Sequence, residues 1–328
     1  MQIKNYDTVI NKIRPMNIVP LLPPERQELL SFYKRARAAF WVEDEVPYTA
    51  DIPDWDRMSP EERHFMELVL GFFAVSDRIV LSNLIGNFIQ EITIPEAQLF
   101  YNFQAAVEDI HSLTYTNHLL TLVKDPVRIE QLLNSIEHFP SIRKKSEWAT
   151  KWMDRTRPVA HRLIAFAVVE AVYFCASFCS IFWFKEQNKL VKGVGYSNEF
   201  IARDEGLHAA FACALYKNCF EKVPDETIRE IIRDAVEVEC EFVDEALPTA
   251  FVGMNAGLMK QYVRYVADRL AFQLGCSEPI FHDSNPFVFM ERLSLIGKDN
   301  FFEKKVSNYG KVTQSISQEE LTSMLVDF

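Results

Sequence analysis

The stretch AAVEDIHSLTY, residues 105–115, decides the fold of this chain. It has the composition of a helix, and Glu108 and His111 are three residues apart, so both side chains leave the helix on the same face. Tyr115 follows one turn later on that face. A carboxylate and an imidazole one turn apart form half of a common type of metal site. Because such a pair also arises by chance, the interpretation depends on the rest of the chain.

A second pair with the same spacing, Glu205 and His208, strengthens the metal-site interpretation. Two helices of this kind predict a bundle in which two further helices each contribute one carboxylate. The acids within apolar stretches are Asp77, in FFAVSD at residues 72–77, and Glu170. If the chain turns near residues 92–94, Asp77 lies about 16 residues before the turn and Glu108 about 15 after it, level with each other in an antiparallel hairpin. The longer loop between Glu170 and Glu205 only permits proximity.

The predicted metal ligands are therefore four carboxylates and two imidazoles: Asp77, Glu108, His111, Glu170, Glu205 and His208. This ligand set suits iron or manganese, whereas structural zinc favours four-coordinate sites of sulfur and nitrogen. Two divalent ions would balance the four carboxylate charges and make their burial feasible. The alternative is two accidental surface pairs and a stray buried acid. The apolar surroundings of Asp77 and Glu170 count against it.

A third pair, Glu61 and His64, has the same spacing but follows Pro60 in the first turn of a predicted helix. Acids are favoured there by the helix dipole, so we expect this pair to be solvated and to bind no metal. The remaining histidines have no carboxylate at ligand spacing in an apolar setting; they are His118, His138, His161 and His282.

The whole chain reads as all-α. Helices are expected at 24–41, 59–90, 95–123, 126–137, 141–152, 158–185, 198–219, 225–246, 250–274 and 286–292, with a polar loop at 187–197. No alternating strand pattern competes with these helices. Residues 1–22 read as an extended arm, 23–303 as a single helical domain and 304–328 as a flexible tail.

The apolar stretch 163–184 is long enough to span a bilayer and has one charged residue, Glu170. A helix that is apolar on all sides can also be the central helix of a large soluble bundle. It is the only such stretch that stands out, its flanking helices are amphipathic, and a buried acid needs a partner or a metal. We therefore expect a central helix and no membrane span.

Composition narrows the classes of function. The net charge of −11 argues against a general binder of nucleic acid or anionic membranes. The N-terminus lacks the pattern of a signal peptide, and the six cysteines show no Cys-x-x-Cys pairing. We expect a reduced, cytoplasmic protein.

Tyr115 should lie close to the metals. Around it we expect Phe174 and Phe178, which are four and eight residues beyond Glu170, and Ile201, which is four residues before Glu205. Such a dry aromatic and aliphatic wall would shield a reactive oxidised side chain from water.

Four motifs carry a resemblance to a known family: FFAVSD at 72–77, EDIH at 108–111 with Tyr115, ARDEGLH at 202–208, and NFFEK at 300–304. Together they resemble the small, radical-generating subunit of class I ribonucleotide reductase, and the resemblance covers nearly the whole chain. It implies a ferritin-like helical bundle with additional helices around a di-metal carboxylate core. It also implies two iron ions on the six ligands and a stable tyrosyl radical on Tyr115.

The resemblance further implies a path that carries the radical to a cysteine of the large subunit, where ribonucleoside diphosphates are reduced. The path would run through His111, Asp204 and Trp41, and then through Tyr309. The chain would dock on the large subunit through its last residues, Leu325, Val326, Asp327 and Phe328, and would form a homodimer.

Two residues depart from the family pattern. Arg78 follows the first ligand, and Asp109 lies between Glu108 and His111. An added charge beside the site could alter the hydrogen bonds around the ligands.

Two other functions remain alternatives. A di-iron oxidase of the same fold would have a substrate channel beside the metals and no need of Tyr309 or a docking tail. An iron-storage protein or a catalytically silent partner subunit would need neither Tyr115 nor Trp41.

Overall fold

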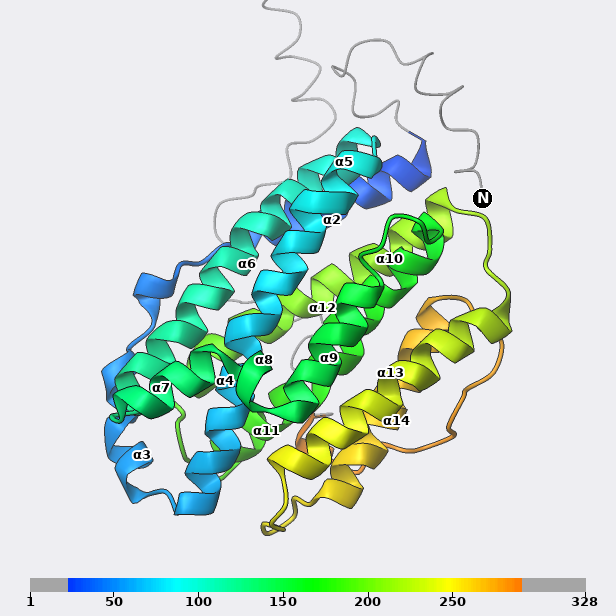
Figure 1. Cartoon of the computed structure of the whole chain (residues 1–328). Helices are drawn as coiled ribbons and strands as arrows, with labels where there is room; N and C mark the ends of the chain where they lie inside the picture. The colour runs from blue at the N-terminus through cyan, green and yellow to red at the C-terminus, as the bar shows by residue number, and fades with distance from the viewer. Residues whose placement is uncertain (1–22, 291–328) are drawn as a thin grey trace, which may run out of the picture.

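Residues 23–290 are described by the structure, a computed structural model, and they fold almost entirely into helices that run side by side (Figure 1). The order of the longer helices is α2 (Pro24–Ala38), α4 (Pro60–Asn83), α6 (Pro95–Leu122), α7 (Pro126–Leu133), α9 (Pro140–Lys151), α10 (Val159–Val168), α11 (Phe174–Glu186), α12 (Val194–Cys219), α13 (Asp225–Ala246) and α14 (Ala256–Gln273). Short elements are η2 (Glu43–Glu45), η3 (Tyr48–Asp51), α3 (Ile52–Arg57), η4 (Leu84–Phe88), α5 (Ile89–Glu91), α8 (Ser135–His138) and η5 (Val169–Tyr173). Within residues 23–290 no strand forms, and the predicted all-α class is confirmed.

Helix α4 begins where the sequence predicts. The Ser59 side chain accepts a hydrogen bond from the Glu62 backbone N–H, and the Glu62 side chain accepts one from the Ser59 N–H. This reciprocal pair satisfies two of the N–H groups that the first turn of a helix leaves free. The helical path then continues through η4 and α5 to Glu91, close to the predicted end of the segment.

Two predicted helix starts are wrong, and in each case a side chain sets the true position. Helix α12 begins at Val194, four residues earlier than expected, because Asp51 accepts hydrogen bonds from the N–H groups of Gly193 and Val194 at 3.0 and 2.7 Å. Helix α14 begins at Ala256 because residues 251–254 form a tight turn and the Asn255 side chain caps the helix.

The long apolar stretch lies at the centre of the bundle. It forms one helical path, Val159–Glu186, of which the most apolar window is fully buried, in agreement with the predicted central helix. The path is not regular, because the π-helical turn η5, Val169–Tyr173, interrupts it and carries Glu170. Such π turns occur frequently at functional sites, and here the extra residue changes the direction in which the following side chains point. Pro60–Glu91 also passes the length and hydropathy test for a membrane span and is two-thirds buried in its apolar window.

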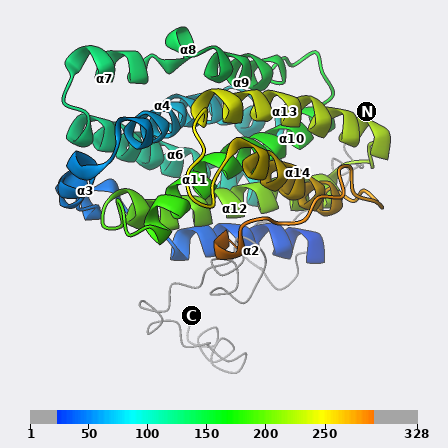
Figure 2. The same cartoon turned by 90° about the horizontal axis from the view of Figure 1, so that it is seen from below.

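The remaining helices cover this core from two sides (Figure 2). Helix α2 packs against α6 and α12 on one side, and α7, α8 and α9 pack against α4 on the other. A buried ion pair fixes α2 to the start of α6, since Arg26 donates to both oxygens of Glu96 at 2.7 Å. The predicted arm at 1–22, the tail at 304–328 and the domain's last residues, 291–303, lie outside the described residues.

Candidate metal centre

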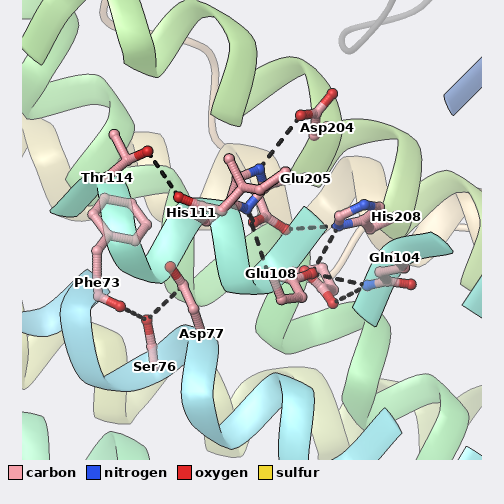
Figure 3. Close-up of polar contacts among 12 residues, drawn as sticks. Phe73, Ser76, Asp77, Gln104, Glu108, His111, Thr114, Asp204, Glu205 and His208 are labelled. Carbon is pink, nitrogen blue, oxygen red and sulfur yellow. Dashed lines mark hydrogen bonds and ion pairs between the residues drawn. The ribbon is translucent and has the colours of Figure 1, made fainter. Parts of the chain in front are cut away.

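Four helical segments each bring an acidic side chain to one place in the core. Figure 3 shows those of α4, α6 and α12. Asp77 comes from α4, Glu108 and His111 from α6, Glu170 from η5, and Glu205 and His208 from α12. Every one of these side chains is buried. Helix α4 packs against α6, and Asp77 lies close enough to Glu108 for the charge of Glu108 to raise its pKa, which agrees with the level placement that the residue count predicts.

Five of the six predicted ligands have ligand atoms that lie close to one another. The ligand atoms of Glu108, Glu170, Glu205 and His208 all lie within 4.8 Å of one another. His111 joins them through Nδ1, which is 2.9 Å from Glu205 Oε1 and 3.4 Å from Glu108 Oε2. His208 Nδ1 lies 3.0 Å from Glu108 Oε1 and 3.2 Å from Glu205 Oε2. Both imidazoles therefore present Nδ1 to the carboxylates.

The sixth predicted ligand, Asp77, lies on the same side of the cluster as His111 (Figure 3). Its Oδ1 is 3.3 Å from the Ser76 hydroxyl, while its Oδ2 is buried with no hydrogen-bond partner. Burial raises the pKa of Asp77 well above its ordinary value, and the charges of Glu108 and Glu205 raise it further. Asp77 is therefore electrostatically part of the same cluster.

The residues present fit a pair of metal ions. Three carboxylate oxygens in the cluster are buried without a hydrogen-bond partner, one each from Asp77, Glu108 and Glu170. An isolated buried carboxylate is very costly unless a cation or several hydrogen bonds compensate its charge. Hard oxygen ligands with two imidazoles are the donor set that iron and manganese prefer.

Without a metal, burial and the neighbouring charges shift the pKa values of this cluster strongly. Burial lowers the pKa of His208, but the carboxylates of Glu108 and Glu205 outweigh burial and raise it to about 9. Burial raises the pKa of Glu170 well above its ordinary value, and the neighbouring Glu205 adds to the effect. Glu205 has a lowered pKa despite its burial, because Glu170, His111 and His208 all stabilise its charged form.

Gln104 is a functional residue that the sequence reasoning missed. Its amide nitrogen, Nε2, donates to Glu108 Oε1 at 3.2 Å and to Glu170 Oε1 at 2.9 Å. It is buried one turn before Glu108 on α6, so its position on the ligand face was a signal that could have found it. A neutral donor shared by two ligands fixes their orientation without adding charge.

A hydrogen-bonded line leads away from the centre through three residues that the resemblance selected. Trp41 Nε1 donates to Asp204 Oδ2 at 2.8 Å, and His111 Nε2 lies 3.4 Å from the same oxygen. His111 thus faces the carboxylates with one ring nitrogen and Asp204 with the other. Burial favours the neutral form of Asp204, but the charge of Arg203 prevails and lowers the pKa of the carboxyl. The fourth predicted residue of the path, Tyr309, lies outside the described residues.

Tyr115 is fully buried, and its nearest aromatic neighbour is a residue the sequence reasoning did not select. Phe73 stacks on it with ring centroids 4.5 Å apart and planes 5° apart. The predicted Phe174 and Phe178 pack on Phe73 at 5.4 and 4.9 Å, and the predicted Ile201 is fully buried on α12. The aromatic wall therefore reaches Tyr115 through Phe73. Phe73 stood in the quoted FFAVSD motif, but its contact depends on how α4 and α6 pack.

The surroundings of Tyr115 disfavour loss of its hydroxyl proton. Burial raises the pKa of the phenol well above its ordinary value, and the nearby carboxylates, led by Asp77, raise it further. The hydroxyl donates a hydrogen bond to Asn198 Oδ1 at 2.7 Å. Tyr115 can therefore lose its proton readily only together with an electron.

Several residues considered in the sequence lie away from the centre. Glu61 is exposed in the first turn of α4, and His64 is next to Arg128, so the third Glu/His pair is not part of the cluster, as predicted. Arg78 and Asp109 are both exposed, so their side chains lie on the outside of the bundle and the ligands on the inside. Each directly follows a ligand, and on a helix the next residue points about 100° away from its predecessor. The six cysteines all lie within the described residues, and none of them forms a disulfide bond.

A helical bundle that encloses a buried cluster of carboxylates and imidazoles defines the class of ferritin-like proteins with a metal centre. Comparison with known sequences narrows the class further, because the family described as ribonucleotide reductase, small chain, matches residues 19–286. The chain belongs to this family, the small subunits of the oxidoreductase ribonucleoside-diphosphate reductase.

Individual relatives agree with this assignment. The chain is 48% identical over 293 residues to ribonucleoside-diphosphate reductase subunit M2 of Homo sapiens, covering 89% of this chain and 75% of the relative. Among solved structures, a ribonucleotide reductase homodimer from Saccharomyces cerevisiae is similar with a TM-score of 0.76 and 28% identity, covering 88% of this chain and 92% of that one. The dimanganese(II)-NrdF of Streptococcus sanguinis shares the fold with a TM-score of 0.72 and 20% identity, covering 83% of this chain and 95% of that one.

Proposed function

We propose that this chain generates and stores a tyrosyl radical on Tyr115 and passes it to a large subunit that reduces ribonucleotides. The observation that carries the proposal is the position of Tyr115. It is fully buried one turn beyond His111, and the ring of Phe73 covers it. It is also close enough to the carboxylates of the cluster for their charges to raise its pKa. A dry aromatic cover is what a long-lived oxidised side chain needs.

Two metal ions would be held by Asp77, Glu108, His111, Glu170, Glu205 and His208. When bound, reduced iron supplies the reaction with dioxygen that provides the one-electron oxidant for Tyr115. The four carboxylates balance two divalent ions, and Gln104 orients two of these carboxylates. Both iron and manganese suit these ligand types. We propose iron because the resemblance to the small subunits of ribonucleotide reductase implies it.

Electron paramagnetic resonance after addition of iron(II) and oxygen tests the proposal. A tyrosyl signal should form in the wild type and disappear in Tyr115→Phe, with iron still bound. Tyr101→Phe is the matched control, because Tyr101 is also buried on α6 and close to Glu170 but lies outside the Phe73 stack. Iron uptake and oxidation without a radical in the wild type would contradict the proposal and favour an oxidase or a silent partner subunit.

The oxidase alternative predicts a substrate channel at the metals. The cavity of about 220 Å³ at the start of α4 is lined by residues such as Pro60, Phe65 and Phe251, and none of its lining residues is a predicted ligand. This cavity gives the oxidase no support.

We propose that the radical leaves through His111, Asp204 and Trp41, and then through Tyr309 to a cysteine of the large subunit. The line of hydrogen bonds from His111 to Trp41 supports the inner part of this path. Replacing Tyr309 by Phe should preserve the radical and docking but stop ribonucleotide reduction. Normal reduction by this variant would remove Tyr309 from the path.

The last residues, Leu325, Val326, Asp327 and Phe328, are proposed to dock on the large subunit. An apolar, acidic peptide suits binding in a groove of a partner. Deleting the last eight residues should leave the radical yield intact and abolish turnover with the large subunit. Retained turnover would refute the docking role.

We also propose that the protein is located in the cytoplasm.

A homodimer is proposed, with the outer face of α6 as its contact. Leu99, Leu113 and Leu120 are exposed on this helix and, with Ala106, recur every seven residues. Such a repeat is typical of a helix that packs along a second helix. Leu113→Glu should give monomers by light scattering, whereas Val252→Glu, at an exposed valine on a distant loop, should not. A dimeric Leu113→Glu variant would exclude this face.

A further inference from the structure

Asn198 is the hydrogen-bond partner of the Tyr115 hydroxyl, and nothing in the sequence pointed to it. The phenol oxygen lies 2.7 Å from Asn198 Oδ1, and both side chains are fully buried. Asn198 lies on α12, three residues before Ile201 and seven before the predicted ligand Glu205. It therefore shares a helix face with the wall and the ligands around Tyr115.

The orientation of the Asn198 amide is set by a second hydrogen bond. Its Nδ2 donates to the Val194 carbonyl oxygen at 2.9 Å, which leaves Oδ1 directed at the phenol. A flipped amide would bring Oδ1 against the Val194 carbonyl oxygen, where two acceptors repel, and would lose the bond from Nδ2. Asp51 holds the same turn of α12 by accepting from the backbone N–H groups of Gly193 and Val194.

This geometry distinguishes between the two oxidation states of Tyr115. The reduced phenol has an O–H to donate, and Asn198 Oδ1 accepts it. Oxidation removes one electron and one proton from the hydroxyl and leaves a phenoxyl oxygen that can only accept. Two oxygens then face each other with no hydrogen between them. The amide oxygen is not a base, so the proton would have to pass to one of the carboxylates near the phenol, which are Asp77, Glu205 and Glu108. Oxidised metal ions held by the ligands would supply the one-electron acceptor.

We propose that Asn198 is a positioning residue that makes the Tyr115 radical a stronger oxidant. It stabilises the reduced phenol by accepting its hydrogen bond and offers no donor to the phenoxyl oxygen. This inference rests on the proposed function, since it concerns the radical on Tyr115. It adds a residue that determines how strongly the stored radical oxidises the next group in the path.

Electron–nuclear double resonance of the radical in deuterated and ordinary water tests the inference in the wild-type protein. It detects an exchangeable proton that is hydrogen-bonded to the phenoxyl oxygen. We expect no such coupling to an amide proton of Asn198. A strong exchangeable coupling that disappears in Asn198→Leu would show that the amide donates to the radical and would overturn the inference.

The Asn198→Leu variant gives the second measurement. A buried hydrogen bond of this kind changes an equilibrium constant by roughly tenfold. The equilibrium constant for reduction of the radical by a small one-electron reductant should therefore be about tenfold smaller in Asn198→Leu than in the wild type. An unchanged or a more oxidising radical would overturn the inference. Ser197→Ala is the matched control, because Ser197 on the same turn bonds His118 on α6 and not Tyr115. Its radical should behave as in the wild type.

The two measurements distinguish three outcomes. If the wild type forms no tyrosyl radical, the proposed function fails and Asn198 is not the cause. If the wild type forms a radical with the amide coupling, the inference alone fails. If Asn198→Leu does not fold, as judged by circular dichroism, Asn198→Ala and the wild-type spectrum carry the test.

Discussion

Removal of metal should make the stability of this protein fall as the pH rises. In the metal-free cluster, Glu108 and Glu205 raise the pKa of His208 from 6.5 to about 9. The folded protein then holds a proton that the unfolded chain releases. Stability from this group is complete below pH 6.5 and is lost as the pH rises through 9. Asp77 and Glu170 have raised pKa values as well and act in the same direction.

The size of the effect follows from the shift at His208. The pKa rises from 6.5 to about 9, and each pKa unit is worth about 1.4 kcal/mol, so this group alone contributes about 3 kcal/mol. In a chain of this length a loss of 1 kcal/mol lowers the melting temperature by about 2 °C, so the metal-free protein should melt about 6 °C lower at pH 9 than at pH 6.5.

Bound metal should reverse the trend. A metal ion needs neutral imidazoles and ionised carboxylates, so binding releases protons and becomes tighter as the pH rises. The increase in melting temperature on addition of manganese(II) should therefore be larger at pH 8.5 than at pH 6.5. Manganese(II) suits this ligand set and avoids the oxygen chemistry of iron.

Thermal melting of chelator-treated protein across this pH range, with and without manganese(II), is the assay. His208→Gln is the control variant, because it removes the titrating group and one ligand together. As the pH rises, the metal-free form of this variant should lose less stability than the metal-free wild type, and manganese(II) should stabilise the variant less than the wild type. A metal-free wild type whose melting temperature stays constant or rises with pH would refute the reasoning.

Three further predictions follow from single contacts. Lys145→Met should lower the free energy of unfolding, measured by urea denaturation, by roughly 3–5 kcal/mol, because it leaves Glu239 buried without its cation. Lys145 Nζ now lies 2.6 Å from Glu239. The double variant with Glu239→Leu should recover most of the lost stability, and additive losses from the two substitutions would contradict the prediction. Gly193→Ala should cost about 1–2 kcal/mol, because its Cβ would lie 2.9 Å from the capping oxygen of Asp51; wild-type stability would exclude that cap as a stabilising contact. Trp41→Phe removes the donor to Asp204 and should reduce turnover with the large subunit while manganese(II) still raises the melting temperature; unchanged turnover would remove the indole from the path.

Residue spacing and side-chain chemistry were enough to select the donor groups of the cluster. Helical periodicity places Glu108 with His111 and Glu205 with His208 on common faces, and this relation holds in any packing of the helices. Asp77 and Glu170 could be selected because an acid in an apolar helix needs a compensating cation. The count of residues on either side of the turn at 92–94 was sufficient to set Asp77 level with Glu108.

The side chains that meet across helices could be identified only from the three-dimensional packing. Phe73 on Tyr115, Gln104 between Glu108 and Glu170, and Asn198 on the Tyr115 hydroxyl all depend on how far each helix is rotated about its axis and shifted along its neighbour. Those rotations result from the close packing of the whole core, to which residues far apart in the chain contribute. Tyr115 and Asn198 are 83 residues apart, and no local pattern encodes their contact.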